Sequence, residues 1–97
     1  IMIKHIVCFK LENPTAELLA KTKDILLSME GNVPEVRSIE VGLDLLHSPR
    51  SYDVILQVVV DDLTALDSYQ KDPYHCDVVK THMQAVASSS IALDYEI

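Results

Sequence analysis

A tyrosine and a histidine stand six residues apart in this chain, on either side of a proline, and their side chains have the chemistry of an acid–base pair. The stretch runs from Tyr69 through Pro73 to His75. A phenol has an ordinary pKa of about 10 and stays a hydrogen-bond donor at neutral pH. A neutral imidazole can take a proton from a carbon next to a carbonyl group while a donor holds the developing oxyanion. The pair predicts such a catalytic site, although ordinary packing beside a turn would also place these residue types here.

The proline determines which elements carry the two side chains. Pro73 disfavours helical backbone at Asp72, so a helix that carries Tyr69 should stop there. Asp72 can then cap a second helix whose first residue is Pro73. His75 falls in the first turn of that helix, where the positive end of the helix dipole disfavours the imidazolium. We therefore expect the imidazole to be neutral near pH 7.

Composition excludes several classes of function. The chain has 97 residues, 48% of them hydrophobic, and a formal net charge of -7, which predicts one folded domain over residues 2–97. Only eight Lys and Arg are present and they do not cluster, so we expect no nucleic-acid or membrane partner. No apolar run approaches ~18 residues. Because the start resembles no secretion signal and only two cysteines are present, we expect a cytoplasmic protein with free thiols.

Hydrophobic periodicity predicts the elements that must position the pair. Strands are predicted over residues 2–11, 36–46, 52–60 and 90–96, and helices over 14–30, 63–71 and 73–87. Asn13 and Pro14 are expected to start the first helix and Gly31 to stop it, while Gly42 predicts a bulge or bend in the second strand. The order β-α-β-β-α-β, with a broken second helix, is typical of the ferredoxin-like α+β fold, a four-stranded antiparallel sheet with helices on one face.

The third predicted strand is apolar on both faces. One face carries Ile55 and Val59, and the other carries four aliphatic residues: Val54, Leu56, Val58 and Val60. Helices on one side of the sheet would leave the second face wet, and a chain this short has no spare element to cover it. We therefore predict a two-fold homodimer in which the sheet of one copy packs on the sheet of the other.

Metal and phosphate sites have no sequence signal here. His75 and His82 lie seven residues apart on one predicted helix and should share a face, but a rise of ~1.5 Å per residue separates them by about 10 Å. No spacing of His, Cys, Asp or Glu is typical of a metal site. With only two glycines, the chain has no glycine-rich phosphate-binding loop. We expect neither a metal nor a cofactor.

A further histidine lies on the first predicted strand. His5 shares a face with Ile3, Val7 and Phe9, the face expected to meet the helices. It is either a buried histidine that is hydrogen-bonded to a neighbour or a polar group in an otherwise apolar pocket.

Five segments together resemble the stress-responsive dimeric α/β-barrel (Dabb) family, in the same order and across nearly the whole chain. They are Met2–Val7, Val36–Gly42, Tyr52–Val54, Tyr69–His75 and Asp94–Glu96. The resemblance implies a ferredoxin-like fold whose sheets pack into a barrel across a homodimer. It also implies a small-molecule cavity between the sheet and the helices, with candidate binding residues His5, Val7, Phe9, Val54 and Leu56.

The resemblance leaves the activity open, because family members differ in what they do. Many have no assigned activity, and some plant members are stress proteins that form larger oligomers. One plant member closes a linear polyketide by an aldol condensation, with a catalytic tyrosine and histidine that match Tyr69 and His75 and a pocket histidine that matches His5. Its third-strand pocket histidine is Val54 here, and its first-helix aromatic residues have no counterpart within residues 18–29.

Two hypotheses follow for the function of the chain. The first is a cofactor-free lyase, isomerase or cyclase that acts on a carbonyl compound with Tyr69 and His75. The second is a non-catalytic protein, either a ligand-binding dimer or a stress-associated oligomerising protein, in which the same two residues have a structural role.

Overall fold

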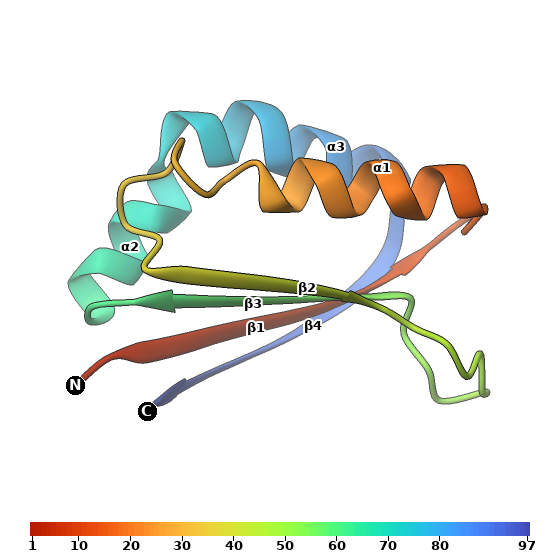
Figure 1. The fold of residues 1–97 in the computed structure, drawn as a ribbon, viewed down its shortest axis with the longest axis horizontal. Helices are drawn as coiled ribbons and strands as arrows, with labels where there is room; N and C mark the ends of the chain where they lie inside the picture. The colour runs from red at the N-terminus through yellow and green to blue at the C-terminus, as the bar shows by residue number, and fades with distance from the viewer.

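The helices of this protein all lie on one side of a single four-stranded sheet (Figure 1). The computed structural model describes residues 1–97. The strands lie in the order β2-β3-β1-β4, and every neighbouring pair is antiparallel. The predicted ferredoxin-like fold is therefore confirmed. The elements are β1 (Ile3–Leu11), α1 (Ala16–Leu27), β2 (Ser38–Leu43), β3 (Val54–Val60), α2 (Leu63–Lys71), a π-helix (His75–Lys80), α3 (Thr81–Val86) and β4 (Ala87–Glu96).

The core lies between the sheet and the helices. β1 is a central strand, and its register places Val7 beside Leu56 on β3 and beside Ala92 on β4. Side chains alternate between the two faces of a strand, so residues that pair across neighbouring strands point to the same face. The side chains of this row, from β3, β1 and β4, therefore all lie on the face that meets the helices. Wholly buried residues come from α1 and the turn after it, from β3 and from α2: Thr22, Leu26, Met29, Val58, Val60 and Tyr69. None of the helices is both long and apolar enough to span a membrane.

The first helix begins two residues later than predicted. Asn13 and Pro14 precede it, and the cap is Thr15, whose hydroxyl accepts a hydrogen bond from the backbone N–H of Leu18 at 3.1 Å. Threonine and asparagine are both good caps, so two candidates so close together cannot be ranked from residue type alone. The helix also ends three residues earlier than predicted, and Gly31, at φ 85°, lies in the turn that follows.

The predicted break between the C-terminal helices is present, but the second helix is not a plain α-helix. α2 ends at Lys71, and the carboxylate of Asp72 accepts a hydrogen bond from the backbone N–H of His75 at 3.0 Å. The segment from His75 to Lys80 is a π-helix, whose hydrogen bonds join residues five apart. β4 then begins at Ala87 rather than at residue 90. The π-helix changes which residues share a face.

The second strand is shorter than predicted and has no bulge. β2 ends at Leu43, and Leu45, which belongs to the predicted strand, lies in the following loop and is 91% exposed. The register between β2 and β3 is unbroken at Gly42. Glycine leaves room there for the side chain of Ile55, because a Cβ atom would lie in a tight contact of 3.0 Å with its Cγ2.

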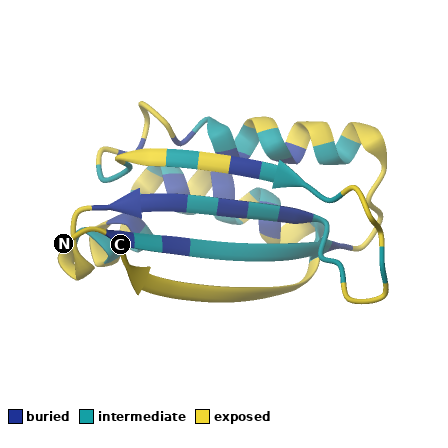
Figure 2. Ribbon diagram, turned by 60° about the horizontal axis from the view of Figure 1, so that its bottom comes forward, coloured by how far each residue is buried: buried dark blue, intermediate teal, exposed yellow.

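The face of the sheet that points away from the helices is covered by no other element of the single chain (Figure 2). We call it the outer face. On β4, Ile91, Leu93 and Tyr95 are 54%, 63% and 41% exposed. The register sets Ile91 beside Cys8 and Leu93 beside Ile6 on β1. These residues of β4 and β1 extend the second apolar face, which the sequence of the third strand predicted.

Candidate functional site

A cavity of about 300 Å³ opens between the sheet and the helices. The predicted site residues that line it come from β1, β3, α2 and the π-helix: His5, Val7, Phe9, Leu56, Tyr69 and His75. Eight of the 13 lining residues are hydrophobic. A mostly apolar wall with a few polar groups is typical of a small-molecule site, and the volume lies at the lower end of the usual range of ~300–1,000 Å³.

Three aromatic rings gather at this cavity. The ring of Tyr69 stacks on the imidazole of His75, with 4.4 Å between ring centroids and 27° between ring planes. The imidazole of His5 meets the same phenol ring at 5.6 Å and 65°, an edge-to-face contact. The tyrosine ring thus contacts two imidazoles, one from the sheet and one from the π-helix.

The hydroxyl of Tyr69 does not bond to either imidazole. Tyr69 is wholly buried, and its hydroxyl donates to the sulfur of Met29 at 3.6 Å. Burial raises the pKa of the Tyr69 phenol well above its ordinary value, so the group remains a protonated donor. A thioether is a weak acceptor, so this hydrogen bond holds the hydroxyl only weakly.

The imidazole of His75 is held neutral by its surroundings. Burial lowers the pKa of His75, and the ammonium of Lys80 and the ring of His5 lower it further. The Tyr69 backbone carbonyl and the Asp72 carboxylate act in the opposite direction on that pKa, but burial has the largest effect. The direction is the one expected from the sequence, but the main cause is burial rather than the helix dipole. The ring atom Nδ1 is buried and makes no hydrogen bond of good geometry.

The imidazole of His5 has a carboxylate partner that sequence reasoning did not single out. Its Nδ1 hydrogen-bonds to the carboxylate of Asp94 on β4. A carboxylate accepts, so Nδ1 of His5 carries the proton of this hydrogen bond. The pairing register of β1 and β4 explains this contact, because it places His5 directly opposite Asp94. Both readings of His5 hold, since it is bonded to a neighbour and lines the cavity.

His82 does not share the cavity with His75. Its Nε2 hydrogen-bonds to the hydroxyl of Thr22 on α1 at 2.8 Å. Met83 lines the cavity in its place, together with Val79 and His75. The prediction that the two histidines share a face assumed an uninterrupted α-helix, and the π-helix between them invalidates it. No group of three or more His, Cys, Asp or Glu side chains is placed to hold a metal ion.

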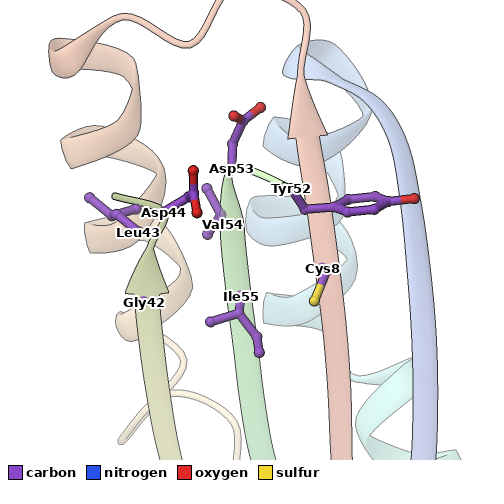
Figure 3. Close-up of a pocket in the computed structure, with 8 residues that line it drawn as sticks. All are labelled: Cys8, Gly42, Leu43, Asp44, Tyr52, Asp53, Val54 and Ile55. Atoms are coloured by element: carbon purple, nitrogen blue, oxygen red, sulfur yellow. The ribbon is translucent and has the colours of Figure 1, made fainter. Parts of the chain in front are cut away.

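Val54, the fifth predicted binding residue, does not line this cavity. It lies at a second cavity of about 260 Å³, which Figure 3 shows across the ends of β2, β3 and β1. Cys8 and Ile55, whose positions belong to the outer face, line the same cavity. Val54 is 2% exposed and belongs to the hydrophobic core.

The carboxylates of this second cavity have structural partners. Asp53 accepts a hydrogen bond from the backbone N–H of Leu11 at 2.8 Å, and Asp44 accepts one from the backbone N–H of His47 at 2.7 Å. Burial raises the pKa of the Cys8 thiol, which disfavours the reactive thiolate. The chemistry therefore gathers at the cavity between sheet and helices.

Comparison with known proteins places the chain in one family and one fold. Residues 3–97 match the family described as the stress-responsive A/B barrel domain, Dabb. No curated protein matches the chain. Among solved structures, a dimeric protein of unknown function with a ferredoxin-like fold from Bacteroides fragilis is 26% identical, with a TM-score of 0.83 over 99% of this chain and 96% of that one.

Two further structures share the fold at lower identity. A Dabb family protein with a ferredoxin-like fold from Mesorhizobium loti is 23% identical, with a TM-score of 0.77 over 99% of this chain and 96% of that one. A hydroxynitrile lyase from Passiflora edulis is 16% identical, with a TM-score of 0.81 over 99% of this chain and 93% of that one. At this identity the likeness supports the fold alone.

Proposed function

We propose, from the premise that this chain belongs to the stress-responsive A/B barrel (Dabb) family, that it binds a small carbonyl compound and acts on it by cofactor-free acid–base catalysis. The observation that carries the proposal is the convergence of His5, Tyr69 and His75 on one largely apolar cavity. A neutral imidazole and a protonated phenol in contact are the groups that proton transfer next to a carbonyl requires.

In this mechanism His75 is the general base and Tyr69 the hydrogen-bond donor. The imidazole takes a proton from the carbon next to the carbonyl, and the electron pair moves onto the carbonyl oxygen. The phenol turns its hydroxyl from the sulfur of Met29 to that oxygen and stabilises the enolate. Proton return to carbon gives isomerisation, and attack of the enolate on a second carbonyl gives cyclisation. His5, oriented by Asp94, holds the phenol ring from the other side.

Carbon–carbon cleavage belongs to the same class of reaction. One structure with this fold is a hydroxynitrile lyase. For a cyanohydrin, the base takes the hydroxyl proton, the bond to the cyano carbon breaks, and cyanide leaves and is protonated as the carbonyl forms. This reaction uses the same base and needs no cofactor.

A non-catalytic ligand-binding protein is the second candidate function. The observation that favours it is the position of the Tyr69 hydroxyl, which is wholly buried and bonded to Met29 rather than to an imidazole. In that case the three rings only shape the wall of a binding cavity.

We also propose that two copies of the chain form a homodimer by packing their outer faces together. The exposed Ile91, Leu93 and Tyr95 on that face support this arrangement, since no element of the chain covers them. The similar protein from Bacteroides fragilis is dimeric.

Catalysis can be tested without knowing the natural substrate. Small ketones (acetone, cyclohexanone and acetophenone) are incubated with the protein in D₂O, and exchange of their α-protons is followed by NMR, beside cleavage of mandelonitrile to benzaldehyde. We expect exchange above the buffer rate for at least one ketone, and a loss of about 10²–10⁴-fold in His75→Ala. Tyr69→Phe, which keeps the ring and removes the hydroxyl, should also slow exchange.

His47→Ala is the matched control, because the side chain of His47 is 68% exposed and lies outside the cavity. It should leave the exchange rate unchanged. Binding without exchange or cleavage for every probe, or full activity in His75→Ala, would refute the catalytic proposal and favour the ligand-binding one.

A further inference from the structure

The cavity contains one lysine side chain that acid–base catalysis does not use. Lys80, the last residue of the π-helix, lines the cavity together with His75 at the start of that helix. In an α-helix two residues five apart point about 140° away from each other. In a π-helix, residues five apart are joined by the backbone hydrogen bonds, so they lie about one turn apart on neighbouring parts of the helix surface. The π-helix therefore brings Lys80 to the side of His75.

The ammonium group of Lys80 is only partly satisfied within the chain. It donates one hydrogen bond, to the backbone carbonyl of Gln70 at 3.1 Å. Lys80 as a whole is half-buried, and its ammonium makes no ion pair with a carboxylate. The exposed Lys71, by contrast, pairs with Asp67 at 2.9 Å. An ammonium has three donors, and a charge that is partly removed from water gains from a counter-ion.

We propose that the ligand of this cavity carries a carboxylate that Lys80 binds, so that the substrate class is a small oxo-carboxylic acid whose carbonyl lies against His75. This inference rests on the proposed function of the cavity and specifies its substrate. A carboxylate at Lys80 offsets the positive charge that weakens His75 as a base, so binding of the acid also strengthens the base that acts on it.

Two probes of the same shape but different charge test the role of Lys80. 4-Oxopentanoate and 4-oxopentanamide differ in charge at one end and share the same ketone. Their affinities for the intact protein are measured by isothermal titration calorimetry at pH 7.5 and low salt. We expect the acid to bind about 10-fold more tightly than the amide, the value of one charge-assisted hydrogen bond.

Three variants assign this preference to the side chain. Lys80→Met keeps the aliphatic stem and should bind both probes equally, with the amide affinity unchanged. Lys80→Arg should retain the preference, and so should Lys71→Met, which removes a lysine outside the cavity.

The outcomes separate this inference from the proposed function. Equal binding of the two probes by the wild-type protein, or a preference that survives Lys80→Met, overturns the role of Lys80 and leaves the cavity intact. A lower melting temperature in Lys80→Met with both affinities unchanged shows that Lys80 only caps the Gln70 carbonyl, and it overturns the inference too. Failure of both probes to bind any variant overturns the inference together with the proposed ligand.

Discussion

Replacing Leu93 by alanine should weaken the proposed homodimer by about 30- to 100-fold. Leu93 lies on the outer face of β4, beside Ile6 of β1, and is 63% exposed in the single chain. Full burial of a leucine side chain stabilises by ~1.5–3 kcal/mol. Packing a second sheet on this face can add at most the part of this free energy that corresponds to the exposed fraction of the side chain.

The two-fold symmetry of the proposed dimer doubles the effect of one substitution. The exposed share of Leu93, 63%, corresponds to about 1–2 kcal/mol per copy and roughly twice that for a pair of copies. Alanine keeps the Cβ atom, so we expect a loss of about 2–3 kcal/mol. At ~1.4 kcal/mol for each tenfold change, this gives the stated weakening of the dimer.

Sedimentation equilibrium over a concentration series measures the dimer dissociation constant directly. Leu63→Ala is the matched control, because Leu63 is a similarly exposed leucine, 69%, at the start of α2 rather than on the outer face. It should leave the dissociation constant unchanged. A wild-type protein that sediments as a monomer at micromolar concentration, or equal effects of the two substitutions, would refute the reasoning.

Three further predictions concern stability. Asp94→Ala leaves the buried Nδ1–H of His5 without its acceptor and should cost about 1–2 kcal/mol in urea denaturation; an unchanged midpoint would contradict the hydrogen bond. Burial lowers the pKa of His75 and of His82, so the unfolded chain binds more protons than the folded one. The free energy of unfolding should then be highest above the ordinary histidine pKa of about 6.5 and fall as the pH drops below it. His82→Gln should reduce this dependence of the melting temperature on pH. Gly31 has a φ of 85° and open space around its Cα, so Gly31→Ala should cost about 1 kcal/mol through backbone strain alone, and a stabilised variant would disprove that cause.

The fold was predictable because local signals and the hydrophobic pattern agree. Asp72 caps the helical segment after the proline, as its residue type and position predicted. The boundaries were less predictable, since they depend on competition between neighbours. Thr15 rather than Asn13 caps α1, and residue type alone does not rank two capping residues that lie so close together.

The candidate site was predictable only in part, because it depends on contacts between distant segments. Alternation along β1 placed His5 correctly, but its hydrogen bond to Asp94 follows from strand pairing across 89 positions of sequence. The π-helix has no signature in residue type or spacing, and it decides that Lys80 rather than His82 lines the cavity. The direction of the Tyr69 hydroxyl, which bonds to a sulfur, likewise depends on packing.

The four histidines of the chain allow the most direct test of a small-molecule site at the cavity. His5 and His75 line the cavity, whereas His47 lies in an exposed turn and His82 is bonded to Thr22. Titration with acetophenone, followed through the ring-proton NMR signals of all four, should shift the signals of His5 and His75 saturably and leave the other two in place. Signals that do not move, or four signals that drift together without saturation, would contradict the proposed site.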